Sequence, residues 1–120
     1  METLKKLLDE YKIYIIVKNK ADIIKIENGC LIRKNGKFIY YNNLEEAFHS
    51  IGIKSIKKAL DSGDIIELAN RECPEISIII QKKNDLGYLA TVNGYNTYPP
   101  KVFLSFEKLE NFLSTFDKLW

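Results

Sequence analysis

The chain has 120 residues, with 18 Lys and Arg against 16 Asp and Glu, so its formal net charge is +2. Hydrophobic residues make up 46% and charged residues 28%, which excludes a disordered chain, a collagen-like repeat and a disulfide scaffold. The length fits one domain, residues 1–120, that can bury a core. No window approaches the roughly 18–20 apolar residues of a membrane span, and the first residues lack the apolar stretch of a signal peptide. We therefore expect a cytoplasmic protein without a membrane partner.

The first half of the chain predicts a helix, four strands and a second helix. Leucines at helical spacing open the chain, and a β-branched and aromatic run follows. Asn28-Gly29 and Asn35-Gly36 stand between apolar runs, which is the strongest short-range signal for hairpins. Asn42 or Asn43 is placed to cap the second helix, and Glu46 is placed to complete a capping box from Asn43. The predicted elements are a helix over 3–9, strands over 11–18, 22–27, 30–34 and 37–41, and a helix over 44–51.

The second half predicts a similar series of elements after Gly52, which ends the preceding helix. Pro99-Pro100 breaks the strand ladder or lies at its edge. Segment 65–68 fits a short strand and a helix extension equally well, and 69–74 is predicted to be a loop. The other predicted elements are a helix over 55–61, strands over 76–82, 87–92, 95–98 and 101–105, and a closing helix over 106–116.

The two halves therefore predict an α+β fold in which antiparallel β-meanders are each followed by a helix. A shift of 65 positions gives nine identities when residues 11–51 are compared with 76–116. A second similarity, between residues 4–9 and 56–61, needs a shift of 52. We interpret this as a duplicated ββββα unit, with sub-repeats 1–52 and 53–120, that shares one core because each half alone is marginal in size.

Residues that carry catalysis or bind metals are scarce in this chain. Cys30 and Cys73 lie far apart, and His49 is the only histidine. A structural zinc site usually needs four Cys or His ligands, so no metal site is expected. No nucleophile elbow, phosphate-binding glycine loop or HExxH motif accompanies the histidine. We therefore predict a non-enzymatic protein without a cofactor.

Charge is divided unevenly along the chain. Residues 12–58 hold ten Lys and Arg against four Asp and Glu, a net of +6, whereas residues 59–80 have a net of −4. In the first strand, Lys12, Tyr14 and Lys18 share one face by alternation. Aromatic rings beside cations on a sheet suit single-stranded nucleic acid, because bases stack on rings while cations follow the phosphates. An ordinary solvated sheet face has the same composition, so both interpretations remain open. The predicted nucleic-acid-binding residues are Lys12, Tyr14, Lys18, Lys25, Arg33, Lys34, Lys37, Lys82, Lys83, Tyr88, Tyr95 and Lys101.

The last third of the chain resembles the single-stranded-DNA-binding module of the general positive transcription coactivator. The resemblance is carried by two strands, an aromatic turn region, Pro99-Pro100-Lys101 and the segment 102–109, Val-Phe-Leu-Ser-Phe-Glu-Lys-Leu. Two such modules in tandem are similar to the Whirly fold and, more loosely, to the Pur-alpha repeats. The resemblance implies binding of single-stranded DNA or RNA across the sheet, with Lys82, Lys83, Tyr88, Tyr95 and Lys101 in contact. It also implies pairing of modules through their helices, and the chain is compatible with a homodimer.

Two other functions remain open. Residues 44–63 resemble the small helix-turn-helix modules attached to phage homing endonucleases, which implies that Lys54, Lys57 and Lys58 contact duplex DNA. Two ordinary packed helices explain the same pattern. The small size and segregated charge also suit a protein-interaction module, such as an inhibitor or adaptor of the kind that mobile elements encode. Its contact with a protein partner is then expected in the acidic stretch 61–75.

Overall fold

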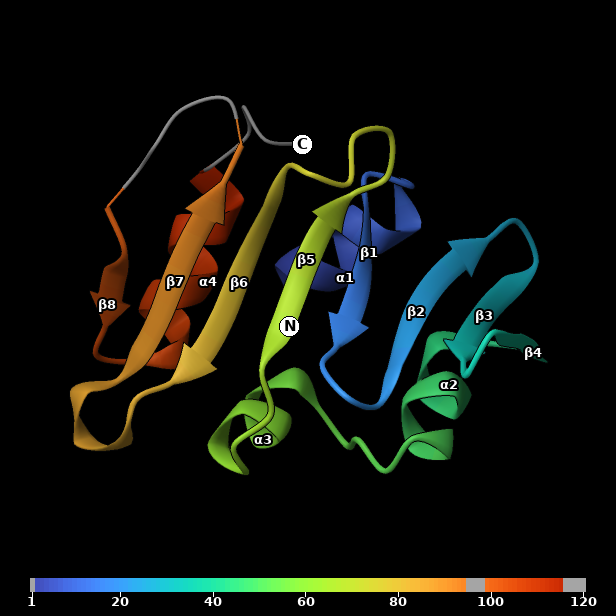
Figure 1. The fold of residues 1–120 in the computed structure, drawn as a ribbon, viewed down its shortest axis with the longest axis horizontal. Helices are drawn as coiled ribbons and strands as arrows, with labels where there is room; N and C mark the ends of the chain where they lie inside the picture. The colour runs from blue at the N-terminus through green and yellow to red at the C-terminus, as the bar shows by residue number, and fades with distance from the viewer. Residues whose placement is uncertain (1, 95–98, 116–120) are drawn as a thin grey trace.

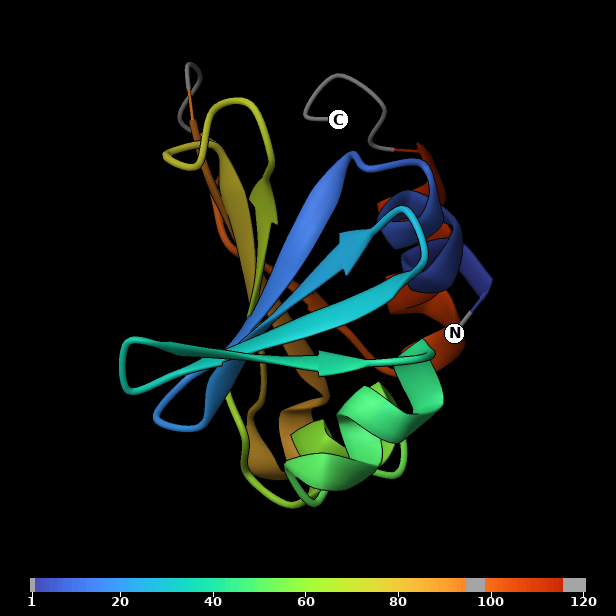
Figure 2. The same ribbon diagram turned by 90° about the vertical axis from the view of Figure 1, so that its right-hand side faces the viewer.

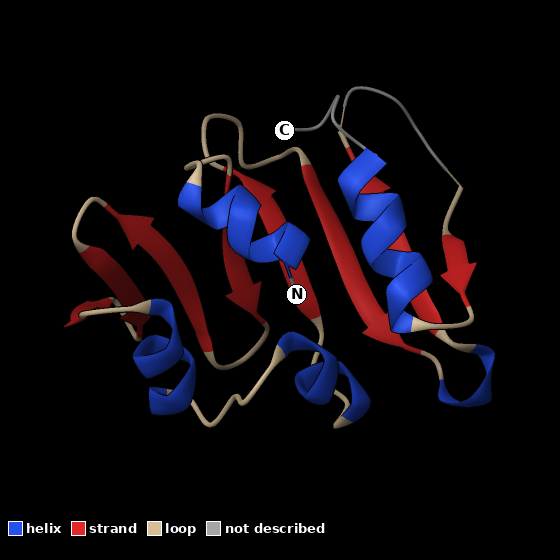
Figure 3. Ribbon diagram, turned by 180° about the vertical axis from the view of Figure 1, so that it is seen from behind, coloured by secondary structure: helices blue, strands red, loops and turns tan. Residues whose placement is uncertain are grey.

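A computed structural model describes residues 2–94 and 99–115 and confirms the predicted α+β class. Eight strands form one antiparallel sheet, and four α-helices lie on one side of it (Figures 1 and 3). In chain order the elements are α1 (Glu2–Asp9), β1 (Ile13–Val17), β2 (Ala21–Ile26), β3 (Gly29–Lys34), β4 (Lys37–Tyr41), α2 (Leu44–Ser50), α3 (Ile56–Asp61), β5 (Ile66–Asn70), β6 (Ser77–Lys82), the 3-10 turn η1 (Asn84–Leu86), β7 (Tyr88–Asn93), β8 (Lys101–Phe103) and α4 (Phe106–Thr115).

The two halves of the chain follow one order of elements, helix, four strands and helix. The strand order in the sheet is β4-β3-β2-β1-β5-β6-β7-β8, so each half is a meander and the two first strands meet at the centre. β1 and β5 pair antiparallel there, with Ile15 opposite Leu68. An antiparallel contact between equivalent strands relates the halves by an approximate twofold axis through this seam. The order of elements thus repeats, while the duplication of a ββββα unit stays a prediction.

The 65-residue shift that suggested the repeat does not match equivalent strands. It places β1 on β6, whereas the structure makes β5 the first strand of the second half. Of the segment 65–68, which fits a strand and a helix extension equally well by sequence, residues 66–68 form the start of β5. The strand then continues into residues predicted to be a loop. The 52-residue shift is the one that pairs equivalent elements, because it places α1 on α3. The predicted strand over 95–98 lies outside the described residues.

A single layer of apolar side chains joins the sheet to the helices. Alternate residues of β1, Ile13, Ile15 and Val17, are at most 1% exposed and face the helices. The register continues this layer across the seam through Leu68 and Ile78. The helices contribute the buried residues Leu4, Leu7, Leu8, Ala47, Phe48, Ile56, Ala59, Leu60, Leu109 and Leu113. The core therefore runs across both halves.

Local chemistry explains how the elements begin and turn. Asn35 and Gly36 both have positive φ, 51° and 76°, as a two-residue hairpin turn requires. The Oδ1 atom of Asn43 accepts a hydrogen bond from the Glu46 amide at 2.8 Å, which confirms the predicted cap of α2. The Glu46 carboxylate in turn accepts from the Asn42 amide at 3.3 Å, one residue earlier than the capping box predicts. Sequence signals thus fix the boundaries of the first half closely.

Candidate functional site

One side of the sheet has no described helix over it. Figure 2 shows all four helices on the other side of the twisted sheet, although Ala69 and Ser77 on the helix-free side are also buried, at 0% and 2% exposed. Strand alternation and register place one set of side chains on the helix-free side, which we call the open face. The open face consists of Tyr14, Ile16, Asp22, Ile24, Ile26, Leu31, Arg33, Phe38, Tyr40, Glu67, Ala69, Ser77, Ile79, Gln81, Leu89, Thr91, Asn93 and Val102.

The open face is rich in apolar and aromatic side chains. Ile24 lies opposite Leu31, and Leu31 lies opposite Tyr40, so an apolar cluster crosses β2, β3 and β4. Phe38 is 58% exposed and Tyr40 is 50% exposed. In the second half, Leu89 lies opposite Val102, which is 49% exposed. Apolar surface of this extent on an otherwise folded chain is typical of a site of interaction.

The charged groups of the open face are paired with one another. Arg33 lies directly opposite Asp22, and its Nε donates to Asp22 Oδ2 at 2.8 Å. The same guanidinium lies 5.9 Å from the centroid of the Tyr14 ring. At the end of β1, the Lys18 ammonium lies 2.9 Å from Glu67 Oε1. Arg33 and Lys18 therefore each have a carboxylate partner within the chain.

The structure divides the predicted nucleic-acid-binding residues between two faces. Tyr14 and Arg33 lie on the open face, and Lys12 and Lys18 flank it at the ends of β1. Register places most of the others on the helix side of the sheet; Lys83 lies in the exposed connection after β6, and Tyr95 lies outside the described residues. The helix-side residues are Lys25, Lys34, Lys37, Lys82, Tyr88 and Lys101. The described members of the set thus do not form one platform.

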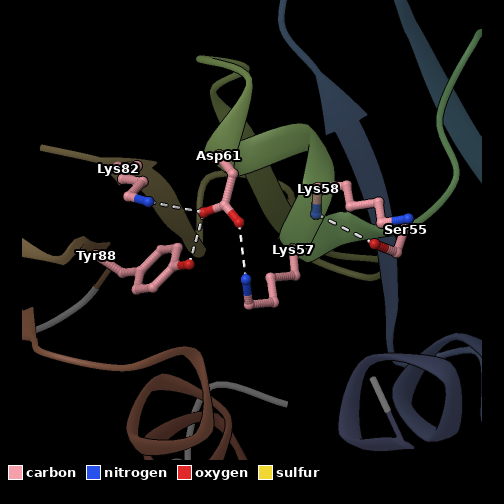
Figure 4. A network of polar contacts seen from close by, with 6 residues as sticks. All are labelled: Ser55, Lys57, Lys58, Asp61, Lys82 and Tyr88. Carbon is pink, nitrogen blue, oxygen red and sulfur yellow. Dashed lines mark hydrogen bonds and ion pairs between the residues drawn. The ribbon is translucent and has the colours of Figure 1, made fainter. Parts of the chain in front are cut away.

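Tyr88 and Lys82 belong to a polar network that joins α3 to the second half of the sheet (Figure 4). The Tyr88 ring is 5% exposed, and its hydroxyl donates to Asp61 Oδ1 at 2.7 Å. Lys82 Nζ donates to the same oxygen at 3.1 Å, and Lys57 Nζ donates to Asp61 Oδ2 at 2.8 Å. The hydrogen bonds from Lys57 and Tyr88 hold the pKa of Asp61 well below its ordinary value, while burial raises the pKa of Tyr88. This network has a structural role, and we call it the Asp61 network.

The acidic stretch 61–75, the predicted contact for a protein partner, is also largely used within the chain. Asp61 belongs to the network above, and Asp64 lies 3.2 Å from Lys20 Nζ. Glu67 pairs with Lys18, and Glu75 accepts a hydrogen bond from the Cys73 thiol at 2.8 Å. The stretch therefore offers a partner fewer free carboxylates than its sequence suggests.

The helices of the predicted helix-turn-helix rest on different parts of the sheet. α2 packs on β3 and β4, whereas α3 packs on β6. Lys57, a predicted DNA contact, donates to Asp61 within α3. The side chain of Ser55 caps α3 by accepting from the Lys58 amide at 3.1 Å (Figure 4). Each helix thus serves the core of its own half.

A hollow on the helix side is lined by residues of α1 and α2. Its volume is about 550 Å³, and Leu4, Leu8 and Phe48 form part of its apolar floor. Its rim combines cations and carboxylates; the charged residues are Lys5, Asp9, Lys25, Glu45 and Lys54. This mixture of signs gives the hollow no preference for a charged ligand.

Metal and thiol chemistry find no support in the described part of the chain. No group of three His, Cys, Asp or Glu side chains lies close enough there to hold a metal ion. Cys30 is buried in the core, and burial raises the pKa of its thiol, which keeps it protonated. No helix over residues 2–94 or 99–115 has the length and hydropathy needed to cross a bilayer.

The apolar residues of the open face were missed by the sequence analysis, although the sequence contains a signal for them. Strands covered on one side alternate between apolar and polar residues. In Ile23-Ile24 of β2 and Cys30-Leu31-Ile32 of β3, consecutive residues are all apolar, so apolar side chains point to both sides of the sheet. Such strands predict that both sides of the sheet are covered, whereas the helices in the described part of the chain cover only one.

Comparison with protein-family models, with curated proteins and with solved structures finds no match for this chain. The resemblance to the coactivator and Whirly modules therefore stays a prediction.

Proposed function

We propose that the chain is a protein-interaction module whose open face binds a partner protein. The observation that carries this proposal is that β2 and β3 have apolar residues on both sides, while the helices of residues 2–94 and 99–115 cover only one. Leaving apolar side chains in water forgoes roughly 25 cal/mol for each Å² that burial would remove from water. A partner that covers Ile24, Leu31 and Tyr40 supplies that burial.

The composition of the open face fits a protein interface. Figure 1 shows the sheet broadside. Tyr14, Tyr40 and Arg33 are of the residue types that dominate binding energy at such interfaces. We expect these three side chains to contribute most to affinity.

The charges of the open face favour a partner protein over nucleic acid. Binding to nucleic acid depends on free cations that replace condensed counterions along the phosphates. Arg33 and Lys18 instead hold carboxylates at 2.8 and 2.9 Å. Single-stranded nucleic acid stays the alternative proposal, because Phe38 and Tyr40 offer exposed rings for stacking. The partner that fits best presents an apolar surface with little net charge.

Site-specific photo-crosslinking in the native cells tests this proposal. The variant Tyr14→p-benzoylphenylalanine places the photoreactive group on the open face, and Lys108→p-benzoylphenylalanine places it on the exposed side of α4 as a matched control. We expect position 14 to capture one protein in a nuclease-resistant adduct that position 108 does not form. A nuclease-sensitive adduct at position 14 would support the nucleic-acid alternative. Identical adducts at both positions, or none at position 14, would contradict the proposal.

A further inference from the structure

The two edges of the sheet differ in how far they are protected from pairing. An edge strand leaves a row of backbone N–H and C=O groups without a neighbour, and proteins commonly blunt such edges with short strands or proline. β8 has three residues and follows Pro99-Pro100. β4 has five residues, Lys-Phe-Ile-Tyr-Tyr, without proline, and β3 is its neighbour on one side only. Among the described strands, β4 is therefore the edge open to pairing.

β4 is also apolar and exposed on both sides. Phe38 and Tyr40 are 58% and 50% exposed on the open face. Ile39 is 48% exposed on the helix side, although it lies opposite Ile32, which is 1% exposed. Ile39 thus leaves its outer half in water. A strand placed beside β4 would bury that outer half and satisfy the free backbone groups at the same time.

We propose that β4 pairs antiparallel with β4 of a second copy of this chain and joins two sheets into one. A twofold axis at Ile39 makes the contact self-complementary, as an isologous dimer requires. Phe38 then lies opposite Tyr40 of the partner subunit, and such aromatic cross-strand pairs stabilise sheets. Lys37, the only charged residue in the strand, lies opposite Tyr41 of the partner subunit. The two copies of Lys37 therefore do not face each other.

Charge complementarity supports a second copy as the occupant. The cations Lys34 and Lys37 close the β3–β4 hairpin, and both lie on the helix side by register. α2 follows β4 directly, lies on the same side and carries Glu45 and Glu46 in its first turn. Antiparallel pairing brings the cationic hairpin end of one copy beside the acidic start of α2 in the other, twice in each dimer. The proposal does not rest on the proposed function, because Ile39 and Lys37 lie off the open face.

Sedimentation equilibrium with matched variants at the two edges tests this proposal. Ile39→Lys and Val102→Lys place the same charge on edge residues that are 48% and 49% exposed. We expect the wild-type chain and Val102→Lys to form dimers and Ile39→Lys to dissociate at least tenfold more readily. A wild-type chain that stays monomeric up to millimolar concentration overturns the proposal. So does an Ile39→Lys chain that dimerises as tightly as Val102→Lys.

A charge exchange keeps the test decisive if Ile39→Lys disturbs folding. Lys37→Glu places a carboxylate beside the acidic start of α2 in the partner subunit, so it weakens the dimer. We expect Glu45→Lys, added to Lys37→Glu, to restore the dissociation constant to within threefold of the wild-type value. A doubly substituted chain that dimerises no better than Lys37→Glu alone overturns the proposed pairing.

Discussion

The two halves of the molecule build the same layer of sheet and helices from different connections. In the first half, short turns join β1 to β2, β2 to β3 and β3 to β4. In the second half, longer segments join β5 to β6 and β7 to β8, and η1 interrupts the path from β6 to β7. Few residues are shared between equivalent strands, yet each half has strands, such as β1 and β7, in which every second residue is buried against the helices. The two halves thus keep the same buried side of the sheet, while their connections and edges differ.

Substitutions at the seam between the halves are expected to reduce the free energy of unfolding most. Ile15 and Leu68 face each other across β1 and β5, and both are 0% exposed. Either Ile15→Ala or Leu68→Ala leaves a cavity beneath both halves, so we expect a loss of about 2–5 kcal/mol in the free energy of unfolding. Urea denaturation followed by circular dichroism measures it. Two separate unfolding transitions in either variant would contradict a core shared by the halves.

Substitution of the glycine at the start of β3 or immediately before β7, the third strand of each half, is expected to have the next largest effect on stability. A Cβ atom at Gly29 would collide with the carbonyl oxygen of Tyr41, and one at Gly87 with that of Phe103. Gly36 has a positive φ of 76° but open space around it. We expect Gly36→Ala to cost about 1 kcal/mol from backbone strain alone, and Gly29→Ala and Gly87→Ala to cost clearly more. Thermal unfolding of the three variants checks this order, which equal losses would contradict.

The first helices of the two halves are held in different ways. α1 buries Leu4, Leu7 and Leu8, whereas the shorter α3 adds the Asp61 network to its apolar contacts. Tyr88→Phe removes one hydrogen bond to Asp61, so we expect a loss of about 1 kcal/mol in the free energy of unfolding. The matched variant Tyr40→Phe, at an exposed ring of the first half, is expected to cost less. Denaturation at pH 7 compares the two, and a larger loss at Tyr40 would contradict this role of the network.

The smallest expected effect is a change in the pH dependence of stability when Asp61, the centre of the same network, is substituted. The pKa of Asp61 is lower in the folded chain than in the unfolded chain. Its contribution is therefore fully present above about pH 4 and is lost as the pH falls toward the folded pKa. We expect Asp61→Asn to flatten this part of the acid unfolding curve. A variant curve parallel to that of the wild-type chain between pH 4 and 2 would show that Asp61 is not stabilised by its partners.

The sequence predicted more of the fold than of the site, for physical reasons. Hairpins and helix caps depend on local residues, so the strands around Asn35-Gly36 and the cap at Asn43 were predicted correctly. The face on which a side chain lies depends on which side the helices cover, which is not a local property. In β6, Ile78, Ile79 and Ile80 are apolar without alternation, so the sequence did not show that Tyr88, opposite Lys82, faces inward. The predicted lysines and tyrosines that lie within the described residues are therefore divided between the two sides of the sheet.

The most direct test of the central claim, that the open face is the binding surface, compares one residue on each side of the sheet. The ligand is the protein captured through position 14, and its dissociation constant is measured at two salt concentrations for Ile24→Lys and Ile51→Lys. Both isoleucines are partly buried, Ile24 on the open face and Ile51 at the end of α2 on the helix side. We predict at least tenfold weaker binding for Ile24→Lys, less than a twofold change for Ile51→Lys, and little dependence on salt. Equal losses in the two variants, or a steep weakening with salt, would contradict the account.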